Sequence, residues 1–263
     1  MSSLSYNIFV LRCLGLWYSD DWITGWKAKI YIGYTALIVL ILYSFTLSHF
    51  IMLYECIDDA NEFANTLFML LTLIAICGKM FNIVSKRQAI EKIMTALQTD
   101  PFTPEDPTEL SINSECIRKI NFCRLYTILY GILTESTCTM LTLASLNRDV
   151  PRGDLPYKAW LPYTISSPNA YWFAYSHQTF GLYIAATTDV AFDTFVPGLM
   201  MMTCGQIQIF NHRFEKIFET LKSTTDPNGD ALHLEDQAIA EKKLVADCIE
   251  HHTAIFESSI LFF

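Results

Sequence analysis

The sequence lacks the short motifs that mark several common classes of enzyme and metal-binding protein. Its eight cysteines form no CxxC pair, and the chain contains no GxSxG, no HExxH, no phosphate-binding glycine loop and no Asn-x-Ser/Thr glycosylation site. His251 and His252 are adjacent, so on a helix they diverge and do not form the i, i+4 pair that holds zinc. We therefore expect no catalytic site, no metal and no cofactor, and we interpret most cysteines as small buried hydrophobic residues.

Charged residues are also scarce, at 17% of the chain, and the formal net charge is -9. Because phosphate binding needs a basic face, the absence of a basic patch argues against a nucleic-acid partner. The first 29 residues offer only the short apolar run Ile8–Leu16, which Arg12 interrupts, so we expect no cleavable signal peptide.

Hydrophobic residues make up 52% of the 263 residues and concentrate in long runs. The run from Ile30 to Tyr54 carries no formal charge and exceeds the roughly 20 residues that a helix needs to cross a membrane. Three further runs follow, at Phe63–Val84, Leu125–Leu146 and Thr179–Phe210. The pattern predicts an all-α fold, a polytopic membrane helix bundle of four spans plus the start of a fifth.

The basic residues predict which way this bundle lies in the membrane, because cytoplasmic loops retain Lys and Arg. If the N-terminus is cytoplasmic, fourteen of the eighteen basic residues lie inside, three lie outside and Lys79 lies within the second span, where its amine would extend to the headgroups. The connection between the first two spans, 55–62, holds four acids and no base. We therefore expect an N-terminus in the cytoplasm and a multi-pass protein.

The segments between the spans complete the predicted organisation. Residues 1–29 form a cytoplasmic or interfacial segment, residues 30–210 the bundle of four helices, residues 211–255 a cytoplasmic helical segment, and residues 256–263 the start of a fifth span. Within the bundle, residues 147–178 form an outer loop rich in proline and aromatic residues, which suits equally a structured lid or ordinary anchoring at the membrane interface. The prolines and acids of residues 98–110 predict a cytoplasmic loop. We expect the segments on either side, 86–97 and 111–124, to extend the second and third spans as helices.

Ionisable residues at membrane depth are costly and therefore mark candidate functional positions. Glu135 either faces a cavity or has a hydrogen-bonded structural role. Asp189 and Asp193 share a helix face, and we favour their pointing to water above the bilayer over their attracting cations or polar ligands.

Three stretches together resemble the insect odorant receptors. VLRCLGLW (10–17) resembles the family's pattern ahead of the first helix, LPYKAWLPYTISSPNAYWFAY (155–175) its second outer loop, and DTFVPGLMMMTCGQIQIFNHRF (193–214) the end of the fourth helix. The resemblance implies a seven-helix subunit with an internal N-terminus in the plasma membrane. It also implies a ligand-gated, non-selective cation channel that assembles with a shared co-receptor and responds to a small volatile organic ligand. The connection between the fourth and fifth helices, at 222–253, is short. It therefore resembles that of an odour-tuning subunit rather than that of the co-receptor, which has a long insertion there.

The same resemblance implies a ligand site in the outer half of the bundle. Mapped onto the predicted orientation, that half contains these residues: Phe68, Leu71, Thr72, Glu135, Thr139, Thr142, Tyr183, Ile184 and Thr187. Packing between helices is the alternative role for each of them.

Two alternative functions remain at this point. A gustatory-type receptor of the same superfamily shares the topology, and a small-solute transporter would also place a site at the midplane, although we find no internal repeat. Because the chain stops as an apolar run begins, we expect it to be incomplete and, without the sixth and seventh helices, not to conduct ions by itself.

Overall fold

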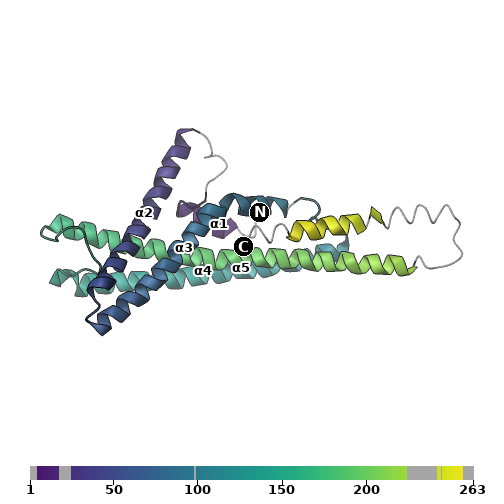
Figure 1. The fold of residues 1–263 in the computed structure, drawn as a ribbon. Coiled ribbons are helices and arrows are strands. Elements are labelled where there is room, and N and C mark those ends of the chain that lie inside the picture. The colour runs from purple at the N-terminus through teal and green to yellow at the C-terminus, as the bar shows by residue number, and fades with distance from the viewer. Residues whose placement is uncertain (1–4, 18–24, 98, 224–241, 244, 257–263) are drawn as a thin grey trace. The chain divides into compact units, whose positions relative to one another are not determined.

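The structure is a computed structural model, and it describes residues 5–17, 25–97, 99–223, 242–243 and 245–256. The described residues are helical in five main elements: α1 (Ser5–Cys13), α2 (Trp26–Glu55), α3 (Ala60–Ala96), α4 (Pro107–Arg148) and α5 (Pro168–Ser223). A short 3-10 helix, η2 (Val150–Arg152), follows α4. Figure 1 shows this all-helical arrangement, which confirms the predicted fold class.

The starts of α4 and α5 follow a common local chemistry. Asp106 precedes Pro107, and its Oδ1 accepts the backbone N–H of Glu109 at 2.9 Å, while the Glu109 carboxylate accepts the N–H of Glu105 at 2.8 Å. At α5, Ser167 precedes Pro168 and its hydroxyl accepts the N–H of Ala170 at 3.3 Å. A capping side chain followed by proline at the first helical position satisfies the free N–H groups and fixes the chain direction.

The helices extend beyond the predicted spans, largely as the sequence predicted. α3 continues from the second span to Ala96, α4 includes the whole flank 111–124, and α5 runs through Pro197 and on to Ser223. Two boundaries differ: α4 begins at Pro107 inside the predicted loop 98–110, and residues 168–178 of the predicted outer loop belong to α5. Residues 224–241 and 244 of the predicted cytoplasmic helical segment and residues 257–263 of the fifth span lie outside the described residues.

Two compact units divide the chain. The first unit contains Leu4–Ser85 and Arg124–Phe195, and the second contains Lys86–Cys123 and Val196–Phe263 together with the first three residues. The first unit thus holds the first three predicted spans and most of the fourth. The second unit holds the extensions of α3, α4 and α5 and the helical residues 245–256.

The outer surface of the first unit is strongly apolar. Leu40, Leu47 and Phe50 on α2 are all more than half exposed, as is Leu133 on α4. Soluble monomers rarely expose contiguous apolar surface of this kind, whereas a membrane helix turns such side chains to lipid. Within the described residues, α2 and α3 are long and apolar enough to cross a membrane; the spans predicted on α4 and α5 are fully helical but less apolar.

The N-terminal pattern VLRCLGLW packs against the start of α2. Gly15 ends the turn after α1 with a φ of +72°, and the Tyr34 and Tyr31 hydroxyls donate to the carbonyls of Cys13 and Trp17, each at 2.6 Å. Leu11 and Trp17 are buried. Tyr31 and Tyr34, one helical turn apart on α2, therefore satisfy one carbonyl at the end of α1 and one in the segment that follows it.

Candidate ligand-binding site

A row of polar side chains joins α4 to α5 in the first unit, and we call it the α4–α5 seam: Glu135, Thr139 and Thr142 on α4, and Tyr183 and Thr187 on α5. The Thr139 hydroxyl donates to the Glu135 carbonyl at 2.7 Å and therefore accepts the Tyr183 hydroxyl, at 2.9 Å. The Thr187 hydroxyl lies 2.7 Å from Glu135 Oε1. Residues spaced by three and four positions share a helix face, which explains how both helices contribute several members.

A cavity of about 190 Å³ lies directly beyond this seam, between α4, α5 and the outer loop. Thr142 lines it, together with Leu141 and Leu182 as apolar walls and Pro156 and Tyr157 from the loop. An apolar protein cavity of about 150 Å³ is large enough for a benzene ring. The cavity therefore has room for a small organic molecule next to a few polar groups, which is the usual composition of a ligand site.

The outer loop is held over the helices by main-chain hydrogen bonds. The side chain of the fully buried Gln178 accepts the Tyr157 N–H at 3.1 Å and donates to the Tyr157 carbonyl at 3.0 Å. One side chain thus bonds both main-chain groups of Tyr157. The Trp160 N–H donates to the Ser48 carbonyl at 3.1 Å. Burial raises the pKa of Tyr157 to about 12, so its phenol stays neutral. The loop is thus an ordered wall of the cavity.

The start of this loop is stabilised by charge. Asp149 is buried and accepts two hydrogen bonds from the neighbouring Arg148 guanidinium, at 2.7 and 3.2 Å. These bonds hold the pKa of the Asp149 carboxyl below its usual value. The Tyr171 hydroxyl, one turn into α5, donates to the Asp154 carbonyl at 2.8 Å and closes the loop.

The nine predicted site residues fall into two groups. Five of them form the seam, and Ile184 is buried on α5 beside it. The three residues of the second span are placed elsewhere: the Phe68 side chain is 77% exposed and lines a different cavity, and Leu71 and Thr72 are exposed. The structure therefore joins the α4 and α5 residues and leaves the α3 residues apart from them.

The structure corrects the environment predicted for the acidic pair on α5. Lys79 lies between the two carboxylates, 2.7 Å from Asp189 Oδ1 and 2.6 Å from Asp193 Oδ1. The sequence did not indicate this pairing: we expected Lys79 to extend to the headgroups, and for the aspartates we favoured water over contact with a cation. The ammonium balances one of the two carboxylate charges, and a paired charge costs far less within a bundle than a single one.

A second polar cluster, which the sequence did not indicate, lies in the second unit. The Arg213 guanidinium donates to both oxygens of the buried Glu109 at 2.9 Å, and to the carbonyls of Pro101 and Thr103 at 2.8 Å. Burial tends to raise the pKa of Glu109, but the bonds from Arg213 and the Glu105 N–H outweigh it and lower that pKa. The contact joins residues more than one hundred positions apart, so helix periodicity alone does not reveal it.

Comparison with known proteins agrees with this arrangement. A sequence profile described as 7tm Odorant receptor matches residues 59–260. The chain belongs to the odorant receptor family. The predicted resemblance is confirmed, and the family is one of membrane receptors that act in olfaction rather than one of enzymes.

Individual relatives of the receptor are distant. Odorant receptor Or1 of Anopheles gambiae is 24% identical over 252 residues, which are 95% of this chain and 57% of that protein. Isoform A of odorant receptor 46a of Drosophila melanogaster is 24% identical over 209 residues, 79% of this chain and 53% of that protein. The chain thus spans little more than half the length of these relatives.

Solved structures show the same fold. The olfactory receptor OR5 of Machilis hrabei in complex with eugenol superposes with a TM-score of 0.73 at 15% identity, over 98% of this chain and 63% of that one. The OR5 structure described without eugenol gives a TM-score of 0.66 at 15% identity, over 98% and 68%. The receptor is therefore a polytopic helical membrane bundle.

Proposed function

We propose that the receptor is the odour-tuning subunit of a ligand-gated, non-selective cation channel that assembles with a co-receptor in the plasma membrane. In this proposal a small volatile organic molecule binds in the cavity beyond the α4–α5 seam, and its binding shifts the equilibrium between closed and open states. The observation that carries the proposal is the seam, where Thr139 contacts Tyr183 and Thr187 contacts Glu135, together with the cavity next to it that Thr142 lines.

The chemistry of the cavity suits a volatile ligand. Leu141, Ala144 and Leu182 give it apolar walls, and the charges of Arg148 and Asp149, which also line it, are paired with each other. Binding would therefore gain mainly from buried apolar surface, at about 25 cal/mol per Å². Thr142 is the seam hydroxyl that lines the cavity; it donates to the Cys138 carbonyl at 2.9 Å, so its oxygen can accept a hydrogen bond from a ligand hydroxyl. The OR5 structure that superposes on this chain with a TM-score of 0.73 is a complex with eugenol.

The proposed orientation has the N-terminus in the cytoplasm. It places the acidic α2–α3 connection and the outer loop outside, and the Arg213 cluster in the cytoplasm with residues 211–255. The excess of basic residues in segments on the N-terminal side of the membrane supports it.

The channel proposal is tested by recording from oocytes that express the receptor from its natural transcript together with an odorant co-receptor. A panel of volatile alcohols, esters and phenols is applied under voltage clamp. We expect an inward cation current for at least one ligand class, and none when the receptor is expressed without the co-receptor. Silence across the panel, while a reference receptor responds in the same cells, would contradict the proposal.

A further inference from the structure

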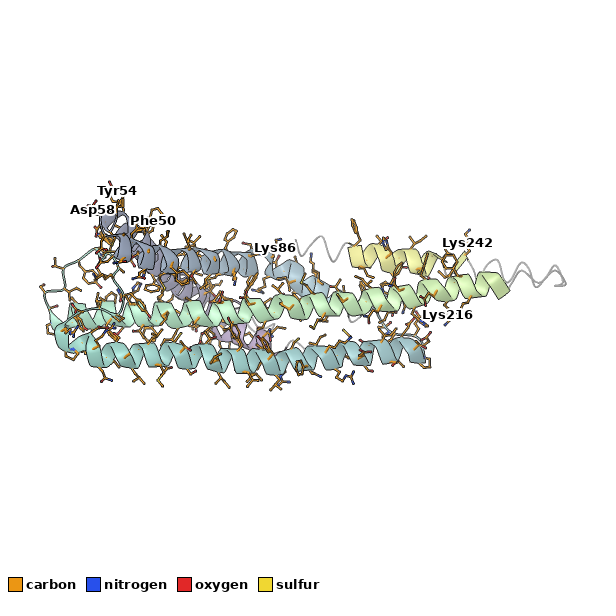
Figure 2. The ribbon with its side chains drawn as sticks, turned by 90° about the horizontal axis from the view of Figure 1, so that it is seen from below. Phe50, Tyr54, Asp58, Lys86, Lys216 and Lys242 are labelled. Carbon is orange, nitrogen blue, oxygen red and sulfur yellow. The ribbon has the colours of Figure 1, made fainter. Side chains whose placement is uncertain are left out.

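A larger cavity lies on the opposite side of the outer loop from the seam, between α2, α3 and the loop. Its volume is about 410 Å³, within the range of about 300–1,000 Å³ that is common for small-molecule sites. It lies near the end of α2 that carries Phe50 and Tyr54, which Figure 2 labels. Pro156 and Tyr157 line both this cavity and the one beyond the seam, and the other lining residues differ.

His49 is the buried polar group of this cavity. Its side chain is 2% exposed, and its Nδ1 lies 2.9 Å from the Phe45 carbonyl. Because a carbonyl only accepts hydrogen bonds, Nδ1 carries the proton, and the neutral ring then keeps its acceptor lone pair on Nε2. The ring is fixed by an edge-on contact with Phe45, with 4.5 Å between the ring centroids. His49 therefore offers a positioned hydrogen-bond acceptor to whatever enters the cavity.

The remaining residues that line the cavity favour an uncharged, partly apolar ligand. Phe68, Met69 and Pro156 provide apolar surface. Glu62 on α3 and Lys158 in the outer loop also line the cavity, and they form an ion pair with each other. Because the two charges are already paired, neither an acid nor an amine gains a free partner, and an ionic ligand would have to displace one of them.

We propose that this cavity is a second binding site, for a small neutral alcohol or phenol whose hydroxyl donates to His49 Nε2 while its apolar body packs against Phe68 and Met69. The site is distinct from the seam, so it goes beyond the function proposed above and does not require the channel. A ligand bound here contacts Tyr157, the residue that also walls the smaller cavity.

The proposal is tested with the purified full chain in nanodiscs, by fluorine NMR titration of two water-soluble probes. 4-Fluorophenol carries the hydroxyl donor, and 4-fluoroanisole has the same ring but no donor; empty nanodiscs correct for partition into lipid. We expect 4-fluorophenol to bind about tenfold more tightly, the effect of one hydrogen bond to a buried acceptor. His49→Phe should reduce this ratio to about one, and His49→Gln, which retains an acceptor, should restore part of it.

Two further variants locate the site. Asn65 is exposed and lines the cavity, so Asn65→Trp should fill the cavity without disturbing the core and weaken both probes. Thr137→Val, at an exposed position of α4 that lines neither cavity, is the control and should leave both dissociation constants unchanged. Equal binding of the two probes to the unmodified chain, or wild-type binding by Asn65→Trp, would overturn the proposal. An effect of Thr139→Val that His49→Phe does not share would place the probes at the seam and would also overturn it.

Discussion

Gly15 shows how one residue fixes the N-terminal segment. Its φ of +72° is unfavourable for other residues, and an added Cβ would lie 2.7 Å from Tyr34 Cδ1. We expect Gly15→Ala to destabilise the packing of α1 on α2 by about 1–3 kcal/mol, because both the backbone conformation and the Tyr34 ring must change. Hydrogen exchange of the peptide covering residues 5–17 measures the effect as lost protection.

Gly33 provides the matched control for this substitution. It lies inside α2 with nothing within 4 Å of an added Cβ, so Gly33→Ala should leave exchange at residues 5–17 unchanged. Equal exchange in the two variants would show that Gly15 does not determine the turn.

His251 is a second residue whose environment predicts a measurable property. It is fully buried in the second unit, edge-on to Phe102 with 5.3 Å between the ring centroids. Burial, together with the nearby Arg213 charge, lowers its pKa to about 4. Between about pH 6.5 and pH 4 the unfolded chain then binds more protons than the folded one, so the stability of this unit falls as the pH falls through that window, by at most roughly 3 kcal/mol.

The pH effect is measured by hydrogen exchange of peptides from the second unit at pH 7 and pH 5. We expect His251→Phe to lose most of the difference between the two values, because the titrating group is gone. His252→Phe is the control, since His252 is exposed and its replacement should keep the wild-type pH dependence. The same pH dependence in His251→Phe as in the wild type would contradict the assignment.

Between elements, the Lys79 ion pairs are the main polar connection of α3 to α5 in the first unit. Lys79→Met would leave Asp189 and Asp193 facing each other without their cation. Removing one partner of a fully buried pair costs about 3–5 kcal/mol, and since these groups are partly exposed we expect about 1–3 kcal/mol. The change is measured as a lower thermal midpoint in detergent.

Removing all three charges together tests whether Lys79 acts through its ion pairs or only through packing. The triple variant Lys79→Met, Asp189→Asn, Asp193→Asn should recover much of the lost stability, because no unpaired charge remains. Lys92, exposed on the same helix, provides a control whose replacement by Met should be neutral. Failure of the triple variant to recover would show that the charges do not interact in the membrane.

The elements themselves follow closely from the sequence, because each depends on local chemistry. The apolar runs predicted the cores of α2 to α5, and the Asp106-Pro107 and Ser167-Pro168 pairs carry the capping signals that correct the two misplaced starts. The contacts between elements do not follow in this way. Lys79 and Asp189 are 110 positions apart, and nothing in the spacing within either helix indicates that they meet.

At the scale of the whole molecule, membrane orientation was predicted from the distribution of basic residues and stays a prediction. An epitope tag inserted between Asp58 and Asp59, in the exposed α2–α3 connection that Figure 2 marks at Asp58, should be detected on intact cells. A tag at the N-terminus should be detected only after permeabilisation. Detection of the N-terminal tag on intact cells would reverse the proposed topology.

The candidate site was predicted in part. The resemblance to odorant receptors led to the α4 and α5 residues, and their shared helix faces explain why Glu135, Thr139 and Tyr183 meet. The sequence did not show that the α3 residues lie apart from them, because helical periodicity gives the faces of a helix but not which neighbour each face contacts. His49 was missed since nothing in an uninterrupted apolar run indicates that one of its polar residues lines a cavity.

The most direct test of the seam as the odorant site uses its shared hydrogen bond. For the best ligand in the co-expression assay, Thr139→Val and Tyr183→Phe should each raise the half-maximal concentration by about tenfold, and the double variant should be no worse than either single one, because both remove the same bond. Thr137→Val, on an exposed position of α4, should change nothing. Wild-type sensitivity in both single variants, at equal surface expression, would contradict the account.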